Sequence, residues 1–117
     1  MVTVTVKRNE RNGIEEITIS GHAHAGKHGS DIVCAAVSAV SLGTINSADL
    51  LLGSNPNVQF AEREGGYIHW KVGDCPDPLI SEKQQLLAES LVISLFMIAE
   101  TNGKYVSIQD PKWQGGV

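Results

Sequence analysis

The residues best suited to chemistry are Cys34 and the histidines that precede it, in the segment G-H-A-H-A-G-K-H-G-S-D-I-V-C. A cysteine becomes a good nucleophile when its thiolate is favoured and a histidine can accept its proton. His22 comes 12 residues before Cys34, and the glycine-rich stretch between them can fold back to bring an imidazole nitrogen to the sulfur. The spacing favours Cys34 as nucleophile and His22 as general base and acid.

A predicted helix start at Cys34 would assist this chemistry. Ser30 and Asp31 are typical N-cap residues, and a cap at Asp31 makes Cys34 the third helical residue. The backbone N–H groups in the first turn of a helix have no hydrogen-bond partners within the helix. Together with the helix dipole, they would stabilise the negative charge of a Cys34 thiolate. They could also bind the negative oxygen of a tetrahedral intermediate. Asp31 could instead orient a histidine, but an aspartate before a helix is more often a cap.

Other interpretations of these residues stay open. A single cysteine in an apolar segment is more often a packing residue than a nucleophile. His24 and His28 compete with His22 for the role of base, although each could simply face solvent. Cys75 has no histidine nearby in the sequence and is a weak candidate, and His69 is expected to face solvent or a partner from an alternating strand.

Zinc binding is the other chemistry that these residue types permit. Three histidines and a cysteine form the pattern H-x-H-x3-H-x5-C between His22 and Cys34. This spacing fits none of the common zinc patterns, and the glycines make the loop a poor preformed cage. We therefore expect no metal site and no cofactor.

The elements around this segment begin with a predicted β-hairpin. Valine alternates with polar residues over 2–6, and isoleucine repeats the alternation over 17–19. Asn12-Gly13 lies between them and is a favoured pair for a tight turn. Ile14 is out of phase with Ile17, which indicates a β-bulge in the second strand.

Two apolar segments predict helices. Residues 32–52 are apolar on nearly every side, so we expect this helix to be buried on several faces. Its serine, asparagine and aspartate residues argue against a membrane span. Ser81-Glu82-Lys83-Gln84 is a capping-box pattern that predicts the start of a second helix, and Asn102-Gly103 predicts its end.

A second hairpin and a final strand complete the expected fold. Alternation over 58–60 and 68–72 flanks a turn at Gly65-Gly66, and 105–108 is a short strand before a polar tail. The order is ββαββαβ, an α+β fold with a small, mainly antiparallel sheet packed with two apolar helices. We expect one domain over 1–117.

Composition excludes several classes of protein. Hydrophobic residues make up 42% of the 117 residues and charged residues 19%, as in a soluble globular chain. The net charge of −4 argues against a nucleic-acid partner. The first residues lack the pattern of a signal peptide, and two distant cysteines do not suggest a disulfide scaffold. We expect a cytoplasmic protein without a membrane partner.

The motif around Cys34 resembles that of the ribosomal-processing cysteine protease family, called Prp. The resemblance is carried by G-H-A at 21–23 and D-I-V-C-A-A at 31–36, with Gly29 and Ser38 at family-like spacing. The length and the ββαββαβ order also agree. In that family the histidine of G-H-A and the cysteine of D-I-V-C form the catalytic pair, which correspond to His22 and Cys34.

The resemblance also implies a substrate and an assembly. It implies an endopeptidase that removes the short N-terminal extension of a large-subunit ribosomal protein, after an apolar, aromatic-containing motif. It further implies a homodimer. This agrees with the two predicted helices, which carry more apolar residues than are needed to cover one face of the sheet. No role is implied for His24, for His28 or for the tail after Pro111. The alternative function is a non-enzymatic, ribosome-associated binding module, in which Cys34 is a packing residue.

Overall fold

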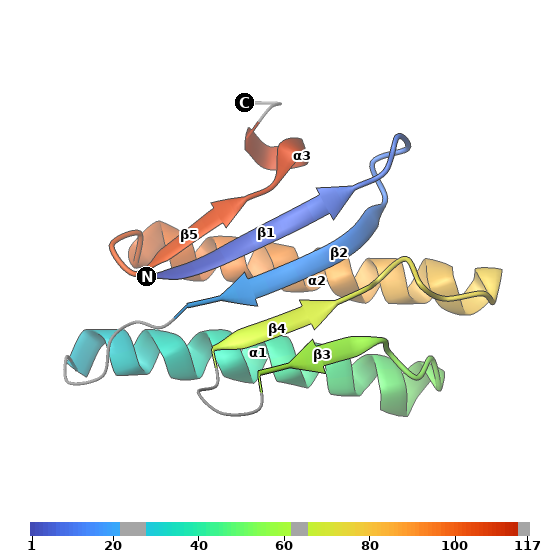
Figure 1. The fold of residues 1–117 in the computed structure, drawn as a ribbon, viewed down its shortest axis with the longest axis horizontal. Helices are drawn as coiled ribbons and strands as arrows, with labels where there is room; N and C mark the ends of the chain where they lie inside the picture. The colour runs from blue at the N-terminus through green and yellow to red at the C-terminus, as the bar shows by residue number, and fades with distance from the viewer. Residues whose placement is uncertain (22–27, 62–65, 115–117) are drawn as a thin grey trace.

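The computed structural model describes residues 1–21, 28–61 and 66–114, with the backbone alone for 28–31 and 114. The elements follow the expected ββαββαβ order, with one short helix added at the end (Figure 1). They are β1 (Val2–Arg8), β2 (Ile14–Ser20), α1 (His28–Leu52), β3 (Val58–Phe60), β4 (Tyr67–Trp70), α2 (Pro78–Thr101), β5 (Val106–Gln109) and α3 (Pro111–Gln114).

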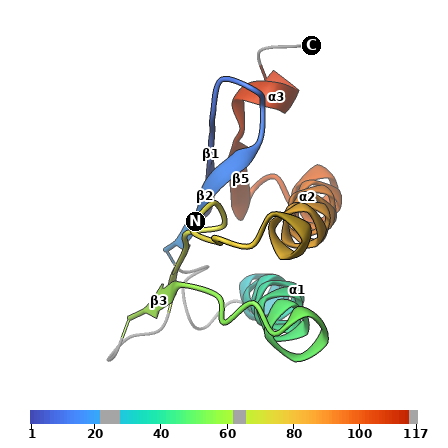
Figure 2. The ribbon, with the colours of Figure 1, turned by 90° about the vertical axis from the view of Figure 1, so that its right-hand side faces the viewer.

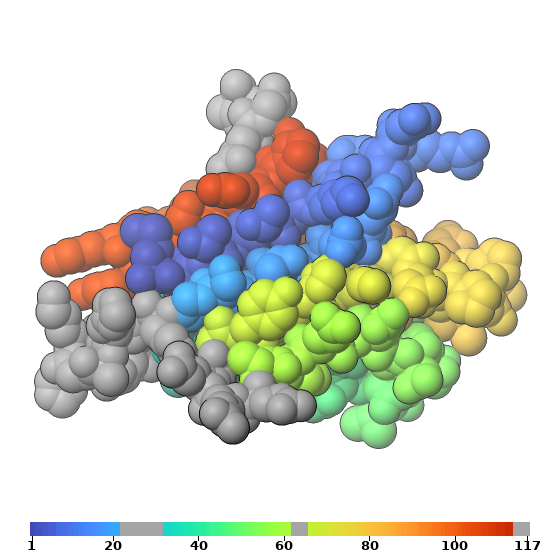
Figure 3. All heavy atoms as spheres, in the orientation of Figure 1, coloured from blue at the N-terminus to red at the C-terminus, as the bar shows by residue number. Residues whose placement is uncertain are grey.

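The five strands form one mixed sheet in the order β3-β4-β2-β1-β5. β1 and β5 are parallel, and the other neighbouring strands are antiparallel. Both long helices lie on the same side of the sheet (Figure 2). The opposite side is visible in Figure 3, where side chains of β1, β2, β4 and β3 form the surface and no described helix covers them. The α+β prediction is confirmed.

The first hairpin contains the predicted bulge. Lys7 pairs with Glu16 but Arg8 pairs with Ile14, so Glu15 is an extra residue in β2. Asn12 in the turn has a φ of 67°, a conformation that asparagine tolerates better than most residues. The extra residue lets Ile14 and Ile17 both face the core, where each is buried.

Both long helices begin earlier than the sequence suggested. α2 begins at Pro78 and is capped by Asp77, whose side chain accepts hydrogen bonds from the N–H groups of Leu79 and Ile80. The predicted capping box at Ser81 is therefore wrong, and proline at the first helical position accounts for the earlier start. The predicted end of this helix is confirmed, since Asn102 is its C-cap.

α1 buries one face, not several as predicted. Its buried residues follow helical spacing and pack against the sheet and α2: Val33, Val37, Ser41, Ile45 and Ala48. Its opposite face is exposed in the single chain, including Ile32 and Leu50. By length and composition alone, Ile32–Leu52 could cross a membrane, but its buried stripe is typical of a core helix.

A buried ion cluster joins the far end of the sheet to α2. Arg8, with 2% of its side chain exposed, donates to both carboxylate oxygens of Asp110 at 2.8 and 2.9 Å. It also donates to both oxygens of Glu89 at 2.8 Å. These hydrogen bonds raise the pKa of Arg8, Glu89 contributing more than Asp110, and the guanidinium lowers the pKa of Glu89.

The tail after β5, which the sequence analysis described only as polar, contains a short helix. Asp110 accepts a hydrogen bond from the N–H of Lys112 at 3.0 Å and so starts the short helix α3. Trp113 then meets Phe96 of α2 edge-to-face, with ring centroids 5.8 Å apart. The end of β5 is thereby held against α2.

Gly21 and Gly66 tie together the ends of β2 and β4. The N–H of Gly21 donates to the carbonyl of Gly66 at 2.9 Å, and both glycines have positive φ, 93° and 72°. A Cβ on Gly21 would lie 2.3 Å from the carbonyl oxygen of Met1. Only glycine therefore fits where the chain leaves β2 for His22.

Replacing Arg8 by methionine should destabilise the fold, because Asp110 would be left as a buried carboxylate without its guanidinium. We expect a loss of about 3–5 kcal/mol in the free energy of unfolding, measured by urea denaturation. Lys7→Met is the matched control in the same strand, since the Lys7 side chain is 65% exposed, and it should cost less than about 1 kcal/mol. Equal losses in the two variants would refute the role of the ion cluster.

Gly21→Ala should destabilise the chain more than Gly53→Ala. Both positions have positive φ, which costs alanine about 1–2 kcal/mol, but a Cβ at Gly53 meets nothing within 4 Å. The difference between the variants therefore isolates the clash with Met1. Urea denaturation measures both, and a Gly21→Ala protein as stable as Gly53→Ala would contradict the close approach.

Candidate active site

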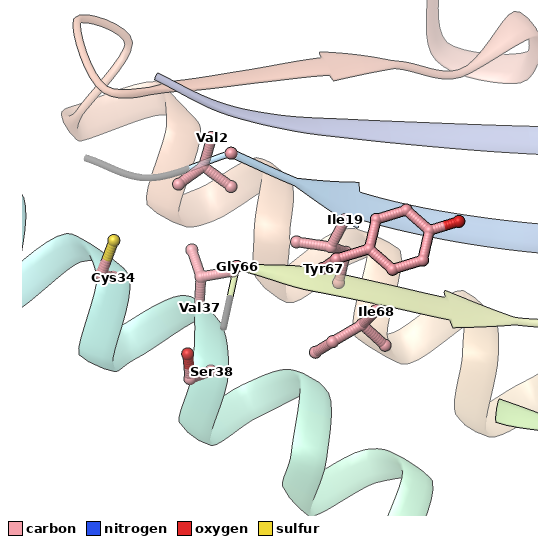
Figure 4. Close-up of a pocket in the computed structure, with 9 residues that line it drawn as sticks. Val2, Ile19, Cys34, Val37, Ser38, Gly66, Tyr67 and Ile68 are labelled. Atoms are coloured by element: carbon pink, nitrogen blue, oxygen red, sulfur yellow. The ribbon is translucent and has the colours of Figure 1, made fainter. Parts of the chain in front are cut away.

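Cys34 lies at one wall of a cavity of about 200 Å³ between α1 and the sheet (Figure 4). It is the seventh residue of α1 and is half-buried. Neither Cys34 nor Cys75 is part of a disulfide. The thiol therefore borders a space large enough for a substrate group.

The cavity is built from four elements that are distant in the sequence. α1 contributes Val37 and Ser38, which follow Cys34 by about one turn. The strands supply the opposite wall: Val2 from β1, Ile19 from β2, and Tyr67 and Ile68 from the start of β4, together with Gly66 just before it. Four of the lining side chains are aliphatic, so the cavity offers an apolar environment beside a nucleophile (Figure 4).

The predicted base, His22, lies outside the described residues, as does His24. Gly21, the residue directly before His22, is described and lines the same cavity as Cys34. The chain therefore departs toward His22 from the wall of the cavity. The pairing of His22 with Cys34 stays a prediction.

The predicted helix start at Cys34 is wrong. α1 begins at His28, which makes Asp31 its fourth residue rather than its cap; the Asp31 side chain lies outside the described part. Cys34 is thus beyond the first turn, so the argument from unpaired N–H groups does not apply to it directly. A cap preference is worth only about 1 kcal/mol, less than the packing of the buried stripe that defines α1.

The remaining candidate residues lie away from the cavity. His69 is on the opposite face of the sheet, where its Nε2 lies 2.5 Å from a carboxylate oxygen of Glu16; this contact lowers the pKa of Glu16. The Cys75 sulfur lies 3.9 Å from the carbonyl oxygen of Asp77. Among the described residues no cluster could hold a metal ion, but His22 and His24 lie outside them, so the absence of a metal site stays a prediction.

The sequence did not indicate which strand residues form the walls of the cavity. Val2, Ile19 and Ile68 were placed on the apolar faces of strands, but alternation does not show which strand ends meet Cys34. No feature of the sequence indicated that Tyr67 lines the cavity. The positive φ of Gly21 could have been suspected, because glycine directly before a candidate base is a common sign of a constrained backbone.

Comparisons with known proteins identify relatives that match most of this chain. The family model described as cysteine protease Prp matches residues 1–107. The chain is 37% identical over 95 residues to the ribosomal processing cysteine protease Prp of Bacillus subtilis (strain 168), covering 81% of this chain and 84% of that protein.

Solved structures show the same fold. SMU.848 from Streptococcus mutans has a TM-score of 0.82 at 31% identity, covering 93% of this chain and 92% of that one. The essential ribosomal processing protease Prp of S. aureus, in complex with a covalently linked product peptide, has a TM-score of 0.79 at 28% identity, covering 93% and 98%. The chain belongs to the Prp family of ribosomal processing cysteine proteases.

Proposed function

We propose that this protein is a cytoplasmic cysteine endopeptidase that removes the short N-terminal extension of a large-subunit ribosomal protein. Cys34 is the nucleophile and His22 the general base and acid. The observation that carries the proposal is the shared cavity: Cys34 forms one wall, and Gly21, the residue before His22, forms another.

The chemistry follows from the proposed pairing of Cys34 with His22. His22 takes the proton of the Cys34 thiol, and the thiolate attacks the carbonyl carbon of the scissile bond. As the carbon–nitrogen bond breaks, His22 gives its proton to the leaving amine. Water then attacks the thioester, His22 accepts the water's proton, and the Cys34 thiolate is released.

Two observations support a ribosomal-protein substrate. The B. subtilis relative is named for ribosomal processing, and the S. aureus relative carries a covalently linked product peptide, the kind of adduct that nucleophilic catalysis forms. The net charge of −4 also favours a basic partner, and ribosomal proteins are basic. The aliphatic walls of the cavity suit the apolar motif implied by the resemblance.

We further propose a homodimer formed through the uncovered helix faces. Exposed apolar side chains line the outer face of α2 at roughly helical repeats, and more lie on α1: Leu79, Leu86, Ile93, Met97, Ile32 and Leu50, each 49–81% exposed. Exposed large apolar side chains in this number on two neighbouring helices are typical of an interface. A second copy would bury them by two-fold symmetry.

The protease proposal is tested with a peptide that spans the ribosomal protein's N-terminal extension, with cleavage read by mass spectrometry. Wild type should cut one bond, while Cys34→Ala and His22→Ala should be slower by about a thousandfold or more. His69→Ala is the matched control, because this histidine lies on the opposite face of the sheet, and it should retain activity.

Each result has a distinct meaning. Full cleavage by Cys34→Ala would eliminate the nucleophile, and full cleavage by His22→Ala would eliminate the base. A peptide that wild type leaves intact would show that the substrate assignment is wrong.

The dimer is tested by sedimentation at micromolar concentration. Wild type should sediment as a dimer, and Leu86→Glu combined with Ile93→Glu should sediment as a folded monomer, because both side chains are exposed in the single chain. A monomeric wild type would rule out the proposed assembly.

A further inference from the structure

A second pocket, of about 230 Å³, lies between α2 and α3 and shares no described lining residue with the Cys34 cavity. Its lining residues are Ile93, Phe96, Met97, Glu100 and Trp113. The capping of α3 by Asp110 and the edge-to-face contact of Trp113 with Phe96 hold the wall formed by α3 in place. The family match ends at residue 107, so the wall supplied by Trp113 lies outside the matched part of the chain.

The lining of this pocket combines apolar and aromatic side chains with one carboxylate. The carboxylate belongs to Glu100, which is exposed and forms no ion pair with another described residue. A long side chain with an apolar stem and a cationic end suits such a lining, because the stem packs on apolar atoms while the charge stays at the rim. Aromatic rings also attract cations, and Lys112 Nζ already lies 5.4 Å from the centre of the Trp113 ring. The pocket therefore fits a lysine or arginine of a partner.

The sequences of the two long helices limit which cation can reach Glu100. In the homodimer proposed above, the outer faces of α1 and α2 meet those of a second copy. These helices contain one lysine and no arginine, and that lysine is Lys83 of α2. Lys83 is exposed and forms no ion pair with another described residue of its own chain. Among the residues of α1 and α2, Lys83 is therefore the cation available to Glu100.

The apolar row on α2 indicates how two copies face each other. Leu79, Leu86 and Ile93 are exposed and recur every seven residues, and Glu100 is the next position in this row. Parallel helices would place Glu100 against Glu100 of the second copy, and like charges repel. Antiparallel helices, related by a two-fold axis midway between Leu86 and Ile93, bury the same apolar row without this repulsion.

The antiparallel arrangement brings Lys83 to the pocket. Positions equally far from the two-fold axis face each other, so Lys83 of one copy faces Phe96 of the other. Side chains of a helix lean toward its N-terminus. In antiparallel helices, Lys83 of one copy and Glu100 of the other therefore lean toward each other. The lysine stem lies against the apolar lining, and its ammonium group reaches the carboxylate.

We propose that the pocket between α2 and α3 is an inter-subunit site that receives Lys83 of a second copy and pairs its ammonium group with Glu100. The inference rests on the homodimer proposed above. It adds the residue that fills the pocket, the antiparallel direction of the helices and a role for α3, which supplies Trp113. By symmetry the dimer holds two such sites.

Charge reversal tests the ion pair, with the dissociation constant of the dimer measured by sedimentation over a range of concentrations. Lys83→Glu and Glu100→Lys each place like charges at both sites, so each should weaken the dimer by roughly tenfold or more. The double variant restores both pairs with the charges exchanged. Its dissociation constant should return to within about threefold of the wild-type value.

A mixture of the two single variants tests whether the pair forms between copies. A heterodimer of Lys83→Glu with Glu100→Lys has opposite charges at both sites, whereas each homodimer has like charges. The mixture should therefore associate roughly tenfold more tightly than either variant alone. Lys71→Glu mixed with Glu10→Lys is the matched control, because both side chains are exposed and lie outside the helices. The control mixture should show no gain over its components.

Three results would overturn the inference: single reversals that leave the dimer unchanged, a double variant as weak as the single ones, or a mixture no tighter than its components. If a reversed variant fails to fold, Lys83→Gln and Glu100→Gln decide, since each removes one charge and should weaken the dimer by about threefold. A monomeric wild type would overturn the assembly and this inference together. Dimerisation is measured without substrate, so failure of the protease proposal leaves the result interpretable.

Discussion

The packing of α1 against the inner face of the sheet is the interaction on which the site depends. Val33 directly precedes Cys34, and Val37 follows it by one helical turn. Both are buried, and their packing holds this part of α1 close to the ends of β1, β2 and β4. Burial of each large aliphatic side chain contributes roughly 1.5–3 kcal/mol. The same contact that stabilises the fold therefore holds a reactive thiol beside an apolar cavity.

The opposite end of the sheet is held by charge rather than by apolar packing. Arg8 connects β1 to α2 through Glu89 and to the end of β5 through Asp110. A buried carboxylate is tolerated there because the guanidinium satisfies both of its oxygens. This clamp orients β1, whose first residues reach the cavity at Val2, so one strand links the ion cluster to the site.

The two faces of the molecule have different chemistry. The outer face of the sheet carries polar pairs such as His69 with Glu16, and it can stay in water without cost. The outer faces of α1 and α2 carry exposed leucine, isoleucine and methionine. To cover one side of a sheet, each helix needs only one apolar stripe. The additional apolar side chains on the outer faces of α1 and α2 therefore indicate a partner that binds the helices, not the sheet.

The sequence by itself determined the five strands, the two long helices, their order ββαββαβ and the chemical pair to examine. Period-2 alternation, the Asn12-Gly13 turn and the phase shift at Ile14 are local signals, and the hairpin and bulge they predicted are present. Cys34 was identified through a motif, which is local as well. The helix starts were less predictable, because capping residues such as Asp31 and Ser81 are also compatible with a first turn.

Only the tertiary structure decided which distant residues surround the thiol. Val2, Ile19 and Ile68 line the same cavity as Cys34 because of the strand register and the packing of α1 on the sheet. No local sequence pattern predicts that these residues lie together. The same holds for the close approach of Gly21 to the carbonyl oxygen of Met1. Local physics sets what each segment can become, whereas long-range packing sets which side chains share a cavity.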